Sequence, residues 1–396
     1  MRIRAKIPPA RRDDSPGRRR SDLLRSVAVR WAGGLTAVLV LAGCAEPEPV
    51  RIGFIGGISG RGADLGISGR NGAQLAVEQR NLAGGIRGRP IEFLVRDDGG
   101  DPQHARRLLR ELVAAGCRSV IGPMTSTIAV ALAEEADSAG IVLLSPTVTT
   151  DALAGIDDHF FRVVAPTRTF ARRVAEYLGV TLGLSRLAVI YDAANAAHAA
   201  SWLKDFRHAY ESEARQLAIV LTFESGTHRD FLTPARRLLA ESPDGILIVA
   251  NSLDAALIAQ QVRKLDPDIQ LAASEWAATA RLTEIGGRAV EGMVVASFVD
   301  ESDTTPSYVA FRRDYLARFG RAPGSAGLTG FDAANTLMNA IAEQRPDQSL
   351  RERLRATATG SAAQGAFAMD RFGDGQRQPR ILTVRNGRFE PAPPPP

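Results

Sequence analysis

Residues 118–150, RSVIGPMTSTIAVALAEEADSAGIVLLSPTVTT, contain a strand, a helix and a second strand, and each strand ends in a short polar loop. The apolar runs at 119–121 and 141–144 are closed by Gly-Pro and Ser-Pro, which is typical of buried strands in a parallel sheet. Between them, apolar residues recur at three- and four-residue spacing from Ile128 to Ala139, which predicts a helix. The stretch therefore predicts one strand–helix–strand unit of a parallel α/β sheet.

Hydroxyl side chains follow both strands of this unit. Ser126 and Thr127 come after the first strand, and Thr147 and Thr149 come after the second. In an open parallel sheet, ligands bind beyond the carboxyl ends of the strands. The first pair also lies at the start of the predicted helix, where free backbone N–H groups and the helix dipole favour an anion such as a carboxylate. Ser or Thr is equally suited to a plain helix N-cap, so the pattern alone leaves both interpretations open.

The positive charge of the chain is concentrated at its N-terminus. The formal net charge is +5, but residues 1–43 hold ten Lys or Arg and three Asp or Glu, a balance of +7, which leaves −2 for the rest. Nucleic-acid binding needs a basic surface on the folded part of a protein, because phosphate neutralisation supplies most of the affinity. We therefore expect no nucleic-acid partner.

The N-terminal segment has the order of a bacterial export signal. An arginine-rich region up to Arg30 precedes an apolar stretch at 31–41 that is too short to span a bilayer as a permanent helix. The stretch ends in Leu-Ala-Gly-Cys, which resembles the lipobox, in which the cysteine becomes the lipid-modified first residue of the mature protein. We expect residues 1–43 to be a lipoprotein signal peptide, Cys44 to carry the lipid, and 44–49 to be a tether to the membrane.

The rest of the chain alternates strand patterns with helix patterns. A strand is predicted at 91–96, before the central unit, and a second series of apolar runs and amphipathic segments lies between 160 and 298. This alternation is typical of doubly wound parallel sheets. Residues 366–370 and 380–384 are expected to form a hairpin, and 391–396 a disordered tail.

The sequence contains no recognisable catalytic or metal-binding arrangement. The five histidines are scattered, and there is no Ser-His-Asp order, no His/Cys set with metal-ligand spacing and no phosphate-binding loop. The three aspartates at 97–101 suggest a metal site, but Asp101-Pro102 also fits the start of a helix, where Asp is a favoured cap. We expect no metal, no cofactor and no enzymatic activity.

Four segments carry a likeness to a known family. They are IGFIGGISG at 52–60, the stretch at 71–102, the stretch at 120–150 and FRVVAPT at 161–167. Together with the strand pattern from about residue 50 to 384, they resemble the leucine/isoleucine/valine-binding family of ABC-transporter substrate-binding proteins. The resemblance implies the type I periplasmic binding fold, in which two doubly wound parallel-sheet lobes are joined by three crossovers and close over a ligand.

The resemblance also implies where the lobes begin and end. Crossovers are expected near Pro166, Phe298 and Ala363. Lobe 1 is then expected to comprise residues 50–165 plus 298–362, and lobe 2 residues 166–297 plus 363–390.

The family holds an amino acid by its zwitterion, and matching residues occur here. Ser126 matches the hydroxyl that binds the carboxylate, Thr147 the backbone carbonyl that accepts from the ammonium, and Thr149 its hydroxyl partner. Glu275 matches the acid that neutralises the ammonium, although an ordinary solvated charge is the alternative. A buried zwitterion needs each charge paired, and a helix N-terminus plus one acid supply both signs. The ligand-binding set implied by the resemblance is Ser126, Thr127, Thr147, Val148, Thr149, Asn251 and Glu275.

The side-chain pocket departs from the family pattern. Leu65, Ala196 and Asn251 stand where relatives often carry tyrosines, so leucine, isoleucine or valine does not follow from the resemblance. Asn251 and Trp276 would suit a larger or more polar side chain. The sequence predicts a lipid-anchored periplasmic receptor that captures an amino acid, branched-chain-like or related, for an ABC permease. A sensor or regulator of the same fold, and a receptor for an amide, urea or aromatic acid, remain open alternatives.

Overall fold

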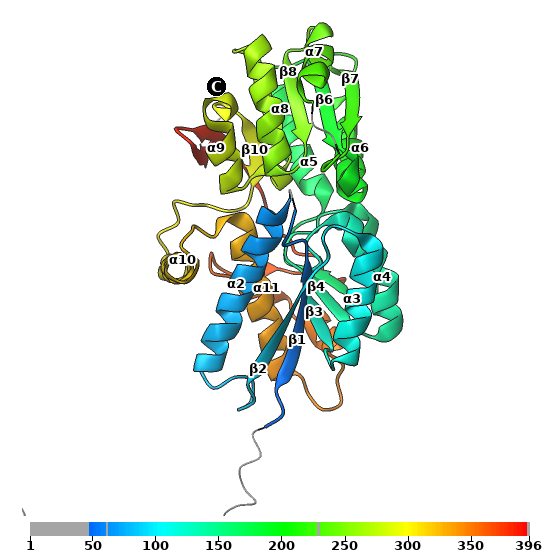
Figure 1. Cartoon of the computed structure of the whole chain (residues 1–396), viewed down its shortest axis with the longest axis vertical. Helices are drawn as coiled ribbons and strands as arrows, with labels where there is room; N and C mark the ends of the chain where they lie inside the picture. The colour runs from blue at the N-terminus through cyan, green and yellow to red at the C-terminus, as the bar shows by residue number, and fades with distance from the viewer. Residues whose placement is uncertain (1–46, 61, 228–229, 394–396) are drawn as a thin grey trace, which may run out of the picture. The chain divides into compact units, whose positions relative to one another are not determined.

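The computed structural model describes residues 47–60, 62–227 and 230–393. The predicted signal peptide and Cys44 lie outside these described residues. From residue 49 onward, the backbone builds two large sheets with helices on both faces, which confirms the predicted α/β class with parallel sheets (Figure 1). We refer to the layers around the first sheet as lobe 1 and to those around the second sheet as lobe 2.

The sheet of lobe 1 has five parallel strands in the order β2-β1-β3-β4-β5. The strands are β1 (Val50–Gly56), β2 (Ile91–Asp97), β3 (Ser119–Ile121), β4 (Val142–Ser145) and β5 (Phe160–Arg162). Helices α2 (Ala63–Leu82) and α11 (Gly324–Glu343) cover one face, and α3 (Pro102–Ala114) and α4 (Ser126–Ala139) cover the other (Figure 1). The other elements packed with this lobe are α10 (Pro306–Phe319), α12 (Leu350–Arg355), β11 (Thr359–Gly360) and β12 (Phe367–Ala368).

The sheet of lobe 2 has seven strands in the order β14-β13-β10-β9-β8-β6-β7. The strands are β6 (Arg186–Asp192), β7 (Gln216–Phe223), β8 (Gly245–Val249), β9 (Gln270–Ala273), β10 (Val294–Ser297), β13 (Arg380–Arg385) and β14 (Arg388–Pro391). The last two run antiparallel to their neighbours. Helices α5 (Thr167–Glu176) and α6 (Ala196–Tyr210) cover one face, and α7 (Leu232–Ala240), α8 (Ser252–Leu265) and α9 (Ala280–Gly286) cover the other.

Short helical turns complete the connections. They are η1 (Asp151–Leu153), η2 (Tyr177–Thr181), η3 (Ala193–Asn195), η4 (Glu275–Ala277) and η5 (Gly287–Val290).

The strands of lobe 1 are buried on both faces. Leu143 and Leu144 are adjacent on β4 and neither is exposed; Leu143 packs with α3 and α4, and Leu144 packs with α2 and α11. Each buried leucine contributes about 1.5–3 kcal/mol relative to an exposed one. A strand covered on both faces needs apolar residues at every position, which explains the uninterrupted apolar run in the sequence.

The ends of α3 and α4 follow from single residues. Asp101 caps α3, because its carboxylate accepts from the backbone N–H groups of Gln103 and His104 at 2.7 and 2.9 Å. Asp101 of the aspartate loop is therefore a helix N-cap, one of the two roles that the sequence analysis considered for this loop. Helix α4 stops where Gly140 adopts a left-handed φ of 65°, a conformation that a residue without a Cβ adopts at little cost.

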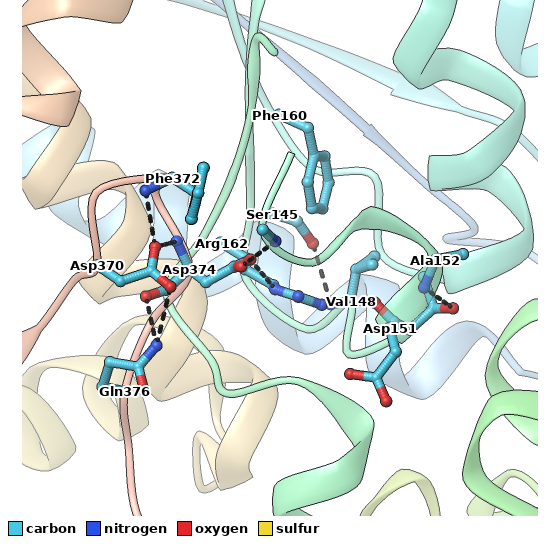
Figure 2. Close-up of polar contacts among 12 residues, drawn as sticks. Ser145, Val148, Asp151, Ala152, Phe160, Arg162, Asp370, Phe372, Asp374 and Gln376 are labelled. Atoms are coloured by element: carbon cyan, nitrogen blue, oxygen red, sulfur yellow. Dashed lines mark hydrogen bonds and ion pairs between the residues drawn. The ribbon is translucent and has the colours of Figure 1, made fainter. Parts of the chain in front are cut away.

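The C-terminal segment differs from the sequence prediction. The hairpin is formed by β13 and β14 around Asn386-Gly387, and residues 366–370 are not part of it. Residues 372–375 lie beside β5 instead, where the buried Arg162 guanidinium donates to Asp374 Oδ1 at 2.7 Å (Figure 2). The third crossover therefore comes after residue 376 and not near Ala363, because a long-range ion pair holds the Phe-Gly-Asp-Gly turn against lobe 1. Strand β14 also reaches Pro391, so the predicted tail begins too early.

Candidate functional site

The strand-end loops of the two lobes line a partly open cavity of about 60 Å³. Lobe 1 contributes the loops after β3 and β4, and lobe 2 contributes the starts of α6 and of η4. The polar side chains on its wall are those of Thr125, Ser126, Thr147, Thr149, Asn195, His198, Glu275, Trp276, Ser297, Ser325 and Thr329. Its apolar wall consists of Leu65, Met124, Pro146, Val164, Phe170, Phe298 and Ala326.

The N-terminus of α4 forms one end of this cavity. The helix begins at Ser126, and its N-cap, Thr125, makes no side-chain cap bond. Ser126 is therefore not the cap, and its hydroxyl lies 3.4 Å from the backbone N–H of Thr150, from which it accepts. The backbone N–H of Thr127 donates across the lobes to Asn195 Oδ1 at 3.1 Å. The helix thus directs its positive end at the cavity and at lobe 2.

A buried serine shapes the loop after β4. Ser145 Oγ accepts from the backbone N–H groups of Thr147 and Val148 at 3.3 and 3.0 Å, and it donates to the carbonyl of Pro123 at 2.8 Å. Thr147 Oγ1 donates to the carbonyl of Met124 at 2.6 Å. These bonds join the two strand-end loops, so lobe 1 alone holds Thr147 at the cavity wall.

Glu275 bridges the two lobes. Its Oε2 accepts from Trp202 Nε1 of the same lobe at 2.8 Å, and its Oε1 accepts from Thr149 Oγ1 of lobe 1 at 3.2 Å. Only 14% of the side chain is exposed, which differs from an ordinary solvated charge. Donors orient both carboxylate oxygens, and Glu275 lines the same cavity as Ser126 of α4.

His198 extends this cluster. It is buried on the first turn of α6, with Nδ1 at 3.1 Å from Thr149 Oγ1 and 3.8 Å from Glu275 Oε1. The rings of His198 and Trp276 pack edge to face, with their centroids 5.4 Å apart. Burial lowers the pKa of His198, and this effect outweighs the negative charges of Glu275 and Asp192, which act to raise it. The imidazole is therefore neutral at pH 7. Its Nε2 is buried and has no hydrogen-bond partner among the described residues.

The predicted binding residues separate into three groups. Ser126, Thr147, Thr149 and Glu275 meet at this cavity. Thr127 and Asn251 lie on an adjoining, wider cleft. The side chain of Val148 is buried in the core between the sheet and α3 and α4, so it is not part of the cavity wall.

The side-chain amide of Asn251 makes its hydrogen bonds within lobe 2. Its Oδ1 accepts from the backbone N–H of Asp254 at 3.0 Å, and its Nδ2 donates to Asp254 Oδ2 at 2.7 Å and to Ser225 Oγ at 2.9 Å. It is the N-cap of α8. In the wider cleft, burial raises the pKa of Asp98 to about 6.

Sequence reasoning did not identify His198 and Trp202 as site residues. They are four residues apart and therefore share one face of α6. That spacing was the available signal, but nothing in the local pattern connects α6 with η4, more than seventy residues later.

The described residues contain no group of three or more His, Cys, Asp or Glu able to hold a metal ion. In the same part of the chain, no helix combines the length and apolar character needed to cross a bilayer.

Comparison with known proteins gives consistent matches. A model of the family described as periplasmic binding protein matches residues 49–386. The Leu/Ile/Val-binding protein BraC3 of Rhizobium johnstonii is 25% identical over 281 residues, which cover 69% of this chain and 74% of that protein.

Solved structures agree on the fold. The branched-chain amino acid transporter substrate-binding protein LivJ of Streptococcus pneumoniae, in complex with isoleucine, matches with a TM-score of 0.80 and 23% identity, over 87% of this chain and 98% of that one. A solute-binding protein of R. palustris in complex with benzoate matches with a TM-score of 0.78 and 18% identity, over 87% and 95% of the two chains. The matches confirm the resemblance and the type I periplasmic binding fold, and they belong to transport receptors, not to an enzyme family.

Proposed function

This chain belongs to the periplasmic binding protein family, and we propose that it is the receptor of an ABC importer that captures one free amino acid between its lobes. The ligand is held as a zwitterion. The observation that carries this proposal is the position of Glu275, a largely buried acid that lines the same cavity as the N-terminus of α4.

The carboxylate is assigned to lobe 1. In the first turn of α4, the Thr127 N–H is used by Asn195. The N–H groups of Ser126 and Ile128 receive no cap bond from Thr125, and the Ser126 hydroxyl lies beside them. A helix N-terminus favours a negative charge both through these donors and through its dipole. Neutral hydroxyl and amide donors then satisfy the carboxylate without a second buried cation.

The ammonium is assigned to Glu275 together with Thr147 and Thr149. Trp202 and Thr149 already orient the carboxylate of Glu275, so the acid is preorganised for a cation. A buried negative charge is costly unless it is paired, and a ligand ammonium supplies the pair. A purely acidic ligand such as an aromatic carboxylate would leave Glu275 unpaired, which favours an amino acid.

Ligand capture is expected to stabilise closure of the lobes. Besides the bond between Thr149 and Glu275, Asp64 Oδ2 of α2 accepts from Ser252 Oγ at 2.7 Å and from Thr279 Oγ1 at 2.9 Å, both in lobe 2. A zwitterion contacting both lobes adds to these bonds only in the closed state, so it shifts the population toward closure.

Location follows from the family and from the N-terminal segment. We place the mature receptor in the periplasm, attached to a membrane through a lipid on Cys44. Its partner is the membrane permease of the importer. Replacing Cys44 by Ser should give unprocessed or soluble protein, and a variant that stays acylated and membrane-bound would contradict the anchor.

Calorimetry with matched ligands tests the zwitterion. Wild-type protein, freed of bound ligand by unfolding and refolding, is titrated with L-valine, L-threonine and the same acids without the amino group. Glu275→Gln keeps the shape and removes the charge, and we expect it to bind the amino acids about 30- to several-thousand-fold more weakly. Glu284→Gln, an exposed glutamate of the same lobe, is the control. Unchanged affinity in Glu275→Gln, or equal binding of the deaminated acids by wild type, would rule out this mode of binding.

A further inference from the structure

The unpartnered nitrogen of His198 indicates what the ligand carries besides its ammonium and carboxylate. His198 lines the cavity, its side chain is only 5% exposed, and its Nε2 has no hydrogen-bond partner among the described residues. A buried polar atom left without a partner costs about 1–3 kcal/mol. Because His198 as a residue lines the cavity, the missing partner of its Nε2 is explained best by a group that the ligand brings.

The hydrogen bonds around Thr149 determine which kind of group that is. Thr149 Oγ1 has one proton and lies 3.2 Å from Glu275 Oε1 and 3.1 Å from His198 Nδ1. The carboxylate can only accept, so the threonine proton belongs to Glu275 and His198 Nδ1 must donate to Thr149. In a neutral imidazole the other nitrogen then has no proton. Nε2 is consequently an acceptor that requires a donor.

The ligand ammonium does not supply this donor. Under the proposed function, on which this inference rests, its three protons are taken by Glu275, by the carbonyl of Thr147 and by the second lone pair of Thr149. The donor must therefore come from the ligand side chain.

The rest of the wall restricts that side chain further. Of the described residues that line the cavity, Glu275 and His198 are the only ionisable ones, so a charged side chain would find no counter-charge. A volume of about 60 Å³ holds roughly four to six water molecules, which corresponds to a small amino acid. Thr329 and Ser325 donate their protons to backbone carbonyls and offer only lone pairs, whereas Ser297 Oγ accepts from the Val299 N–H and keeps its proton.

We propose that the ligand is a small amino acid whose neutral side chain donates a hydrogen bond to His198 Nε2, that is, a hydroxyl or carboxamide amino acid and not a wholly aliphatic one. Hydroxyl and carboxamide groups both donate and accept, as the mixed wall requires. His198 is thus the residue that separates polar from branched aliphatic ligands of the same size.

Isosteric ligand pairs test this assignment. Threonine and valine have the same shape and differ by a hydroxyl in place of a methyl group, and asparagine and leucine form a similar pair. Calorimetry on the refolded wild type should show threonine bound roughly 5- to 150-fold more tightly than valine, the equivalent of one buried hydrogen bond. A preference for asparagine over leucine would identify an amide as the donor, and a preference confined to threonine would identify a hydroxyl.

The variant His198→Asn removes Nε2 and retains an amide able to donate to Thr149. It should reduce the threonine-to-valine ratio to about one. His208→Asn, which changes an exposed histidine on the same helix, should leave the ratio as in wild type. If His198→Asn does not fold, ¹⁵N spectra of histidine-labelled wild type replace it, and the Nε2 resonance should shift with threonine but not with valine.

Two outcomes would overturn the inference without affecting the proposed function. One is wild-type protein that requires the ammonium but binds valine as tightly as threonine. The other is His198→Asn that weakens both ligands by one factor, which would put Nε2 on the ammonium. Failure of the Glu275→Gln test, by contrast, removes the proposed function and this inference together.

Discussion

The two halves of the cavity are built in different ways. Lobe 1 supplies Ser126, Thr147 and Thr149 from the segments that follow the adjacent strands β3 and β4, and hydrogen bonds between hydroxyl side chains and the backbone hold those segments in place. Lobe 2 supplies His198 from α6 and Glu275 from η4, which are distant in sequence and meet through side chains. The first half is a local product of strand order, whereas the second depends on tertiary packing.

This difference separates two tasks. The lobe 1 half presents neutral donors and acceptors at a helix N-terminus, which suits the part common to all amino acids. The lobe 2 half presents the Glu275 carboxylate, which pairs with the ammonium, and an imidazole acceptor, which determines side-chain preference. Substitution of His198 should therefore change which amino acid binds, whereas substitutions in lobe 1 or at Glu275 should change how well any amino acid binds.

The largest effect is expected from the buried ion pair that supports the lobe 1 half. Arg162 is not exposed, and its guanidinium donates to Asp374 (Figure 2). It also donates through Nη1 to the carbonyl of Thr150 at 2.8 Å. Arg162→Met leaves Asp374 buried without its cation, so the free energy of unfolding should fall by about 3–5 kcal/mol. Urea unfolding followed by circular dichroism measures this loss.

A surface ion pair provides the control for Arg162. Arg345→Met breaks a pair with Asp347 whose two side chains are 71% and 75% exposed, and it should change stability by less than about 1 kcal/mol. Equal effects of the two substitutions would show that the Arg162 pair does not support lobe 1.

The lobe 1 half of the cavity could be predicted from local sequence, whereas the lobe 2 half could not. The strand–helix–strand unit at 118–150 and its hydroxyls are a local pattern, so the sequence indicated both the sheet and the loops that form the cavity. Glu275 was identified only through the resemblance, because a lone glutamate after a strand has no distinctive local pattern. The partners that orient it, Trp202 and His198, required knowledge of how α6 packs.

Three expectations of the sequence analysis meet a local geometry that the sequence did not indicate. Asn251 was expected at the ligand, and in the structure it lines the wider cleft while its amide caps α8. Val148 lies between two cavity threonines, yet its side chain points into the core. The third crossover was placed too early because the pairing of Arg162 with Asp374 joins residues 212 apart in sequence, which no local turn signal reveals.

A smaller effect is expected from the donor that orients Glu275. Trp202 is fully buried and stacks on Phe206, with ring centroids 5.3 Å apart. Trp202→Phe keeps an aromatic ring in that stack and removes only the N–H that bonds Glu275. A hydrogen bond to a charged group contributes about 1.5–3 kcal/mol, so amino-acid affinity should fall roughly 10- to 150-fold. Calorimetry in the Glu275→Gln background should show a much smaller loss, and an equal loss there would assign Trp202 a purely structural role.

The contact between the lobes outside the cavity should matter less. Asp64 accepts from Ser252 and Thr279 in a partly exposed position. Asp64→Ala removes both bonds from the closed state and leaves each lobe intact, so affinity should fall roughly 3- to 30-fold. Small-angle scattering should still show a decrease in the radius of gyration with ligand, at a higher ligand concentration. Asp268→Ala, an exposed aspartate of lobe 2, is the control, and identical affinities for the two variants would exclude Asp64 as a closing contact.

The smallest effect concerns two carboxyl groups from opposite lobes, Asp151 of η1 and Asp205 of α6. Burial, together with a hydrogen bond to Asp151 and its negative charge, raises the pKa of Asp205 from 3.8 to about 7. A raised pKa means that the folded protein binds this proton more strongly than the unfolded chain does. The stability that Asp205 contributes is therefore fully present below about pH 3.8 and is lost as the pH rises through about 7.

Asp205→Asn keeps the shape of the protonated acid at every pH, so it should raise the melting temperature at pH 8, with the advantage over wild type disappearing toward pH 4. Asp244→Asn provides a control of opposite sign, because backbone N–H groups of Ser185 and Arg186 and the Ser185 hydroxyl lower the pKa of Asp244. The contribution of Asp244 is lost only as the pH falls below its ordinary pKa of 3.8, so that variant should be less stable than wild type at pH 8 and approach it below pH 3.8. Scanning calorimetry of the three proteins from about pH 2 to 8 compares these slopes. If Asp205→Asn follows wild type across the whole range, the two lobes do not share a proton at this contact.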